Sequence, residues 1–167
     1  EIVGLSELSA QLTTEKFTSL MNECFEFVIK KIELYGGTVS NLDGENIKAV
    51  FGVPESLDEA PVKAIGAAVD LIERFKTFNE LNELPNPISL RFGLENGPVI
   101  VSSVTTDGQS HFNVFGETVN TASRIRDFAE NGQILAGPNL YSKIQKQFEF
   151  FAMEPVPVKG QKEPLPI

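Results

Sequence analysis

Two short segments combine an acidic side chain with a glycine turn, a pattern that suits the binding of phosphates and metal ions. Glu1 precedes an apolar run that is interrupted by Gly4. The backbone N–H groups of such a turn can cradle phosphate oxygens. Further along, Asp43 and Glu45 flank a glycine and bring two carboxylates, the oxygen ligands that Mg²⁺ takes, into one turn. Acidic residues are also common in ordinary solvated turns, so neither segment assigns a function alone.

A third segment, residues 115–124, follows a glycine break with a helical pattern. Asn120 and Arg124 are four residues apart, so they share one face of the predicted helix. An amide beside a guanidinium can hold a sugar oxygen and a phosphate oxygen together. The same spacing also occurs on solvated helix faces, so the alternative of a plain surface remains open at this point.

Composition limits the kinds of partner. The chain has 167 residues, enough for one domain, with 41% hydrophobic and 22% charged residues, which is typical of a globular protein. Its 14 basic residues against 23 acidic ones give a net charge of −9. Because no block of Lys and Arg offsets that charge, we expect no nucleic-acid partner. A small phosphate ligand remains compatible, since a few placed groups or a metal can outweigh the net field.

Cysteine usage and hydropathy indicate which sites the chain can form and where the protein resides. Cys24 is the single cysteine and there is one histidine, which excludes an internal disulfide and makes a Cys/His zinc site implausible. Its place on an apolar helical stripe predicts a buried thiol. No apolar run approaches the roughly 20 residues that span a bilayer. We therefore expect no membrane contact and a cytoplasmic location. Residues 1–5 resemble a strand already under way, so we also expect a longer signalling protein whose first strand begins upstream.

Hydrophobic periodicity predicts alternating helices and strands. Helical spacing covers residues 13–35, 61–78, 119–128 and 140–144, and strand patterns cover residues 1–5, 38–42, 47–51, 88–94, 99–104, 112–115, 133–136, 148–153 and 156–159. Residues 105–110 are predicted to form a loop. The resulting βαββαβ order, with further α and β elements, predicts an α+β fold with an antiparallel-rich sheet and packed helices.

Residues 116–124, G-E-T-V-N-T-A-S-R, resemble the G-D-T-V-N-x-A-S-R signature of class III nucleotidyl cyclase domains. Two further segments agree in register. Residues 1–8, E-I-V-G-L-S-E-L, resemble the family's D-I-x-G-F-T-x-L loop, and residues 35–54 resemble its Y-G-G-T-V-x-K-F-x-G-D-x-x-x-A-V-F-G-x-P hairpin. Residues 91–94 and 158–160 match as well. The resemblance covers nearly all of residues 1–167 as one domain, and it implies a ferredoxin-like core with additional C-terminal strands and a helix.

The resemblance implies an activity and a set of site residues. Members of the family convert ATP or GTP to a 3′,5′-cyclic nucleotide and pyrophosphate with two divalent cations, Mg²⁺ or Mn²⁺. By similarity, Glu1 and Glu45 are the metal carboxylates, Asn120 orients the ribose, and Arg124 stabilises charge at the α-phosphate. The remaining nucleotide-binding positions implied by the resemblance are Ile2, Val3, Gly4, Leu5, Asn41, Asn113 and Lys159. Family sites form between two chains, so it also implies a homodimer or a heterodimer of cyclase domains, joined to an upstream regulatory domain.

Four positions depart from the family pattern. Glu1 and Glu45 stand where Asp is usual, which moves the carboxylate oxygens by one methylene. Asn41 and Asn113 match neither the Lys with Asp or Thr of adenylate-specific members nor the Glu with Cys of guanylate-specific ones. Two interpretations follow: a working cyclase that uses ATP in preference to GTP, or a degenerate domain that binds nucleotide or a partner chain as a regulatory module.

Overall fold

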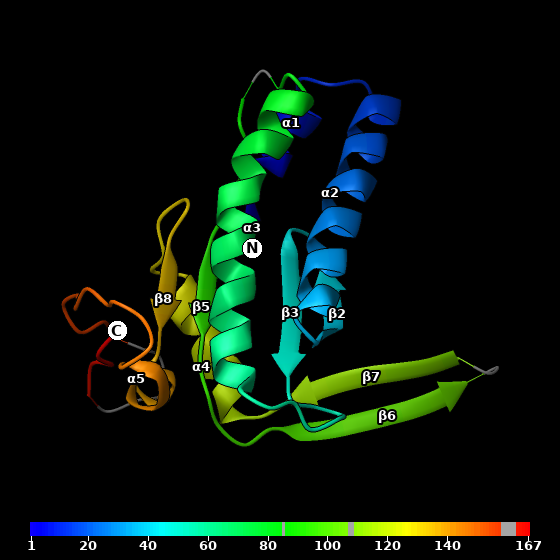
Figure 1. Ribbon diagram of the computed structural model, residues 1–167. Coiled ribbons are helices and arrows are strands. Elements are labelled where there is room, and N and C mark those ends of the chain that lie inside the picture. The colour runs from blue at the N-terminus through cyan, green and yellow to red at the C-terminus, as the bar shows by residue number, and fades with distance from the viewer. Residues whose placement is uncertain (85, 107–108, 158–162) are drawn as a thin grey trace.

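The computed structural model describes residues 1–84, 86–106, 109–157 and 163–167 (Figure 1). The elements, in chain order, are β1 (Ile2–Val3), α1 (Leu5–Ser9), α2 (Thr14–Leu34), β2 (Gly37–Asp43), β3 (Asn46–Phe51), α3 (Ala60–Leu81), β4 (Ser89–Leu90), β5 (Phe92–Leu94), β6 (Ile100–Thr106), β7 (Gln109–Phe115), α4 (Glu117–Arg126), β8 (Ile134–Ala136) and α5 (Pro138–Ile144). The expected βαββαβ order is confirmed by β1, α2, β2, β3, α3 and β4.

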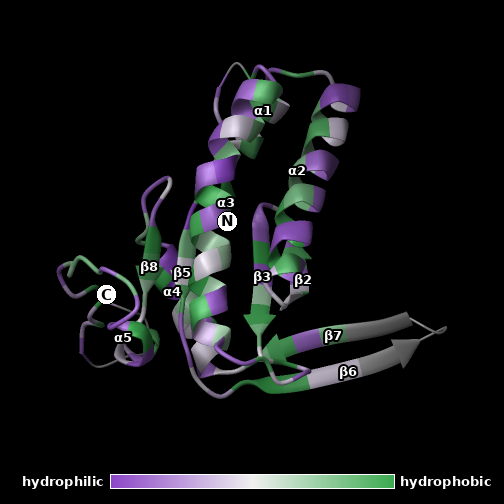
Figure 2. Ribbon diagram, in the orientation of Figure 1, coloured by the Kyte–Doolittle hydropathy of each residue, from purple (hydrophilic) through white to green (hydrophobic). Residues whose placement is uncertain are grey.

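The two long helices, α2 and α3, form where the sequence has helical periodicity and suitable first turns. Thr13 caps α2 by accepting a hydrogen bond from the backbone N–H of Lys16 at 3.4 Å, and α3 has Pro61 in its first turn. Apolar and polar residues intersperse along both helices, as expected for helices with one buried face (Figure 2). None of the helices in the described ranges is long and apolar enough to cross a bilayer.

The main core lies between α2, α3 and the first strands. The rings of Phe75 and Phe78 stack with centroids 5.2 Å apart, and Leu71 is buried beside them. Cys24 is fully buried in the same cluster, where burial raises the pKa of its thiol to about 12. The predicted buried thiol is therefore confirmed, and this side chain is protonated and unreactive at neutral pH.

In the part of the chain that the structure describes, the strands pair as four two-stranded ladders. The pairs β1–β4, β2–β3 and β6–β7 are antiparallel, and β5–β8 is parallel. The β2–β3 hairpin turns between Asp43 and Asn46, and Gly44 has a φ of 56° that an L side chain rarely adopts. The turn that presents Glu45 is thus set by local backbone chemistry, as the sequence predicted.

Two predicted elements in the middle of the chain differ from the structure. The predicted loop at 105–110 is largely ladder, because Thr105 pairs with Ser110 and Thr106 with Gln109 in a two-stranded arm that projects from the body (Figure 1). The predicted strand 88–94 is divided at Arg91 between two ladders.

The late strands were the least accurate prediction. Residues 148–153 form no strand, and Val156 makes an isolated antiparallel bridge with Leu165. Residues 158 and 159 lie outside the described residues. Phe148 and Phe150 pack against the small cluster around Leu140 instead, and Val156 packs against the one around Ile125. Burial against helices and pairing in a ladder give similar sequence patterns in short segments, which explains the error.

Gly93 allows α4 to lie directly on β5, and this contact gives a stability prediction. A Cβ at Gly93 would collide with the carbonyl oxygen of Ala122 and the backbone nitrogen of Arg126. We expect Gly93→Ala to lower the free energy of unfolding by about 3 kcal/mol, because backbone atoms must move. A Cβ at Gly44 would meet no other atom. Gly44→Ala should therefore lower the free energy of unfolding by only about 1 kcal/mol, the cost of placing an alanine in the left-handed conformation. Urea unfolding measures both, and equal losses would contradict the close approach.

Candidate active site

The first loop and the tip of the β2–β3 hairpin lie against each other. The backbone N–H of Ile2 donates to the carbonyl oxygen of Glu45 at 2.9 Å. The backbone N–H and the hydroxyl of Ser6 each donate to Oε1 of Glu45 at 2.8 Å. Gly4, with a φ of 100°, turns the chain from β1 into α1 and so brings Ser6 to this position. The structure therefore places Glu1 and Glu45 on adjacent loops.

The carboxylate of Glu1 is held by two arginines of its own chain. One terminal nitrogen of Arg91 lies 2.8 Å from each of the Glu1 carboxylate oxygens. The Nε of Arg126 lies 3.1 Å from Oε2, and the Glu1 side chain is only 15% exposed. Arg126 also donates to Asn46 and to Asp127. Two positive charges thus compensate this acid before any ligand binds.

Neither arginine was among the predicted site residues. Arg91 was matched only as part of a segment, and Arg126 follows the signature by two positions. Arg91 lies 90 positions from Glu1 in the sequence, and Arg126 lies further still. Periodicity and turn chemistry report on near neighbours, so they carry no signal for such a contact.

Glu1 and Glu45 are both suitable ligands for divalent cations, but their carboxylate oxygens differ in how far other groups already engage them. Carboxylates on adjacent loops are the hard oxygen donors that Mg²⁺ and Mn²⁺ take. Glu45 is half-buried, with Oε1 engaged by Ser6. Glu1 has both oxygens engaged by arginines, so a cation there must share the carboxylate with a guanidinium or displace it. Within the described ranges, no three His, Cys, Asp or Glu side chains cluster closely enough to hold a metal ion.

Three asparagines from separate elements line one cavity of about 260 Å³. Asn41 comes from β2, Asn113 from β7 and Asn120 from the first turns of α4. Lys48, which pairs with Asn41 across the hairpin, lines it too, and the sequence did not indicate this lysine. The structure brings together, within one chain, the residues that the resemblance assigned to the base and the ribose. Amides offer both donors and acceptors, and the lysine offers a positive charge.

Arg124 lies one helical turn beyond Asn120 but does not line this cavity. One of its terminal nitrogens lies 3.3 Å from Oε1 of Glu117, in a partly exposed ion pair. Lys159, the other basic residue predicted for the site, lies outside the described residues. Asn120 and Arg124 lie on one helix, as predicted. The Arg124 side chain, however, points toward Glu117 at the start of that helix.

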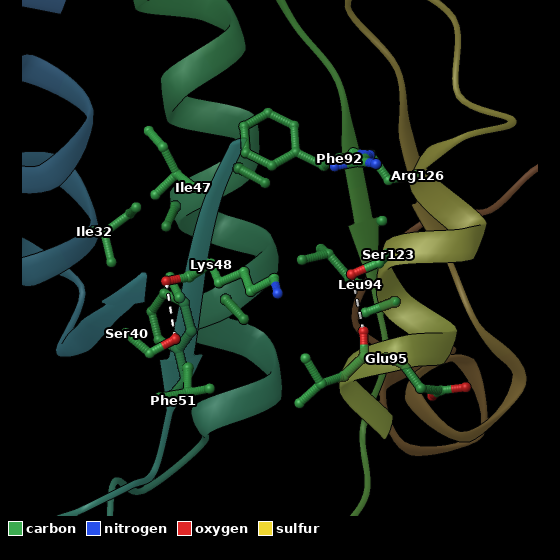
Figure 3. Close-up of a pocket in the computed structure, with 18 of the residues that line it drawn as sticks. Ile32, Ser40, Ile47, Lys48, Phe51, Phe92, Leu94, Glu95, Ser123 and Arg126 are labelled. Carbon is green, nitrogen blue, oxygen red and sulfur yellow. Dashed lines mark hydrogen bonds between the residues drawn. The ribbon is translucent and has the colours of Figure 1, made fainter. Parts of the chain in front are cut away.

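A larger cavity, of about 460 Å³, lies between β3 and β5 (Figure 3). Ile47 and Phe51 project into it from β3, and Phe92 and Leu94 line its other side, with Arg126 nearby. Its walls are mostly apolar side chains from both strands and from the helices beneath them. Lys48, Arg91 and Arg126 also line it, so a few basic groups border a mainly apolar space.

Glu95 borders this larger cavity and is a structural acid. Its Oε1 accepts the backbone N–H groups of Asn96 at 2.7 Å and Leu140 at 3.0 Å, and so anchors the start of α5. Desolvation raises the pKa of Glu95, and the hydrogen bonds from the backbone oppose that rise. Both contacts serve the fold, so Glu95 is not a candidate for proton transfer.

Comparison with known proteins identifies the family. The model of the adenylate and guanylate cyclase catalytic domain matches residues 1–165, so the chain belongs to this family, as the signature segments indicated. The crystal structure of the adenylyl cyclase CyaB from P. aeruginosa is 26% identical, with a TM-score of 0.92 over 99% of this chain and 87% of that one. The guanylate cyclase domain of RhGC from Catenaria anguillulae, in complex with GTP, is 26% identical, with a TM-score of 0.87 over 99% and 89%.

Curated relatives are longer proteins. Adenylate cyclase 1 of Rhizobium meliloti is 23% identical over all of this chain, which spans 26% of its length. The adenylate cyclase of Mycobacterium bovis is 24% identical over 96% of this chain, which spans 36% of its length. The class III nucleotidyl cyclase fold is thus shown for this chain, which covers a minor share of these two relatives.

The pairing of Arg126 with Glu1 predicts competition with cations. We expect Arg126→Gln to tighten Mn²⁺ binding about tenfold, because it removes one positive charge from the Glu1 carboxylate. Titration of free Mn²⁺ followed by electron paramagnetic resonance measures this directly. Arg74→Gln is the matched control, since Arg74 is an exposed arginine on α3 paired with Asp70. An affinity that Arg126→Gln leaves unchanged would show that Glu1 holds no cation in competition with this arginine.

Proposed function

We propose that this domain converts ATP to 3′,5′-cyclic AMP and pyrophosphate as a dimer with two shared sites. The observation that carries the proposal is the cavity lined by Asn41, Asn113 and Asn120, because one chain alone gathers these three amides. The carboxylates of Glu1 and Glu45 are held at the hairpin tip and do not line this cavity. Such an arrangement is expected when each site takes the amides from one protomer and the carboxylates from the other.

Asn41 and Asn113 would face the purine, and Asn120 the ribose. An amide can donate to one edge atom of a base and accept from another, so either purine can be bound. ATP is favoured over GTP because R. meliloti Adenylate cyclase 1, M. bovis adenylate cyclase and P. aeruginosa CyaB all carry names of ATP-using enzymes. Lys48 adds a positive charge at the same cavity and would attract the polyphosphate.

In the reaction, the ribose 3′-hydroxyl loses its proton and its oxygen bonds to the α-phosphorus. The bond from that phosphorus to the bridging oxygen breaks, and pyrophosphate leaves. Divalent cations bound by Glu45 and Glu1 would neutralise the triphosphate and favour the deprotonated 3′-oxygen. Arg124 would exchange Glu117 for the α-phosphate oxygens, where negative charge grows in the transition state.

An exposed apolar surface beside the asparagine cavity supports a partner protomer. Ile100 and Phe115 are directly paired across β6 and β7, and they are 67% and 52% exposed. Asn113 precedes Phe115 by two positions, so both side chains share one face of the arm. Covering this pair with a second chain would remove apolar surface from water next to the nucleotide site.

A role in intracellular signalling follows from this activity. The curated relatives are several times longer than this chain, which leaves room in such proteins for a regulatory domain upstream of the catalytic one. We place the domain in the cytoplasm, where ATP is available, with a homodimer or a second cyclase domain as its partner.

The role of Arg124 gives the first test of the activity. We expect Arg124→Ala to lower kcat about 10²- to 10³-fold while leaving ATP affinity nearly unchanged, because the contact strengthens only in the transition state. Cyclic AMP release with Mg²⁺ and with Mn²⁺ gives kcat, and equilibrium binding of a non-reactive ATP analogue gives affinity. Arg74→Ala is the surface control. A parallel fall in binding and turnover would assign Arg124 to ground-state binding, and absence of product from the unaltered dimer with ATP or GTP would refute the proposed activity.

Mixing two inactive variants tests the shared site. Glu45→Gln and Asn120→Ala should each abolish turnover, since each homodimer carries the same defect in both sites. In a heterodimer of the two, one site has both defects and the other has none, so an equilibrated equal mixture should recover about a quarter of the original activity. Recovery is measured against each variant alone. A mixture that stays inactive while sedimentation shows exchanged dimers would place all these residues in a site within one chain.

A further inference from the structure

Three hydrogen bonds join Glu45 to the first loop. Its carbonyl oxygen accepts the N–H of Ile2 at 2.9 Å. Its Oε1 accepts both the backbone N–H and the hydroxyl of Ser6, each at 2.8 Å. Oε2 accepts no hydrogen bond from the residues that the structure describes. Two donors of one residue therefore converge on one carboxylate oxygen and leave the other for a ligand.

The fold beneath Ser6 fixes its position. Leu5 and Leu8, on either side of it in α1, are 2% and 0% exposed, so the short helix is held on the core. The hydroxyl of Ser9 donates to the carbonyl oxygen of Ser6 at 2.7 Å. Ser6 itself is exposed, and both of its donors are directed at Glu45. The contact is therefore made by a side chain that the core does not need for its own packing.

The backbone of Glu45 is fixed as well, so the length of its side chain decides whether it reaches Ser6. Ile2 holds its carbonyl oxygen, and Asp43 and Asn46 on either side of the turn pair with each other. An aspartate here would carry its carboxylate on one methylene fewer, which shortens the reach by about 1.5 Å. Lengthening the contacts to Ser6 by most of that distance breaks them as hydrogen bonds. The first loop thus matches the length of a glutamate.

We propose that Ser6 is the positioning residue of Glu45: it fixes the carboxylate and leaves Oε2 for a divalent cation, and this arrangement requires Glu at position 45. The inference rests on the cation role that the proposed function gives to Glu45. A free glutamate loses the rotation of three side-chain bonds when it binds a cation, and Ser6 removes that freedom beforehand. Hydrogen-bond partners of metal-binding side chains typically change metal affinity by about 10- to 100-fold.

The affinity of the 167-residue chain for free Mn²⁺, followed by electron paramagnetic resonance, tests the positioning role. Ser6→Ala removes the hydroxyl and keeps the N–H, and we expect it to weaken binding about tenfold. Ser6→Thr keeps a hydroxyl and should bind like the unaltered chain. Ser19→Ala, on an exposed serine of α2, is the matched control.

Two results with Ser6→Ala would overturn the proposal. Unchanged Mn²⁺ affinity, even with a lower urea midpoint, would mean that the contact only stabilises the loop. Tighter binding would mean that the hydroxyl of Ser6 competes with the cation for the carboxylate.

A double-mutant cycle tests the match in length. We expect Glu45→Asp to weaken Mn²⁺ binding, although Asp is usual in the family, because the shorter side chain loses Ser6. Ser6→Ala added to Glu45→Asp should then change the affinity no further, since the contact is already absent. A second tenfold loss, or tighter binding by Glu45→Asp alone, would contradict the proposal.

Glu45→Gln, in the same titration, separates this inference from the proposed function. If Glu45→Gln weakens Mn²⁺ binding and Ser6→Ala does not, the positioning role is wrong and the cation role of Glu45 stands. If Glu45→Gln leaves the affinity unchanged, Glu45 binds no cation, and both the cation role and the positioning role are wrong.

Discussion

The arrangement of this domain depends on the backbone hydrogen bonds of two residues, Glu1 and Ile2. They tie the β2–β3 hairpin on one side to the β4–β5 segment on the other. The hairpin tip thereby lies on the first loop, where Ser6 anchors the carboxylate of Glu45. Without this junction the two acids would be held by separate ladders with no defined relation. The position of the acidic group therefore depends on strand pairing, and the side chains only refine it.

The whole chain is negatively charged, but two positively charged side chains lie at this junction. The protein carries a net charge of −9, yet Glu1 is surrounded by two guanidinium groups in a place that is only 15% exposed to solvent. A buried carboxylate needs such partners, because taking an unpaired charge out of water is costly. The arginines compensate the charge of Glu1, and they also reduce its attraction for a cation. One arrangement therefore stabilises the acid and weakens it as a metal ligand.

Sequence reasoning succeeded where the determinants are local. Helical periodicity predicted α2 and α3 to within a few residues, and the Asp43–Gly44 turn predicted the hairpin that carries Glu45. It missed the pairing of Thr105 with Ser110 and of Thr106 with Gln109, and it predicted a strand at 148–153 that does not form. It also missed the capture of Glu1 by Arg126, which joins two segments distant in sequence. Asn41 and Asn113 were identified through resemblance alone, whereas Asn120 was also indicated by its spacing to Arg124. Their types and spacing carry no periodic signal, since they come from three different elements.

Helix α4 connects the two chemical groups because its faces have different neighbours. Asn120 lies on the face that meets β2 and β7, while Ala122 and Arg126 lie on the face that rests on β5 through the bare backbone of Gly93. The same rigid helix thus carries a cavity-lining amide near its start and a guanidinium bound to Glu1 near its end. Any displacement of α4 relative to β5 moves both at once. Because Gly93 leaves no side chain between the two backbones, the position of α4 on β5 sets the positions of both the cavity-lining amide and the guanidinium.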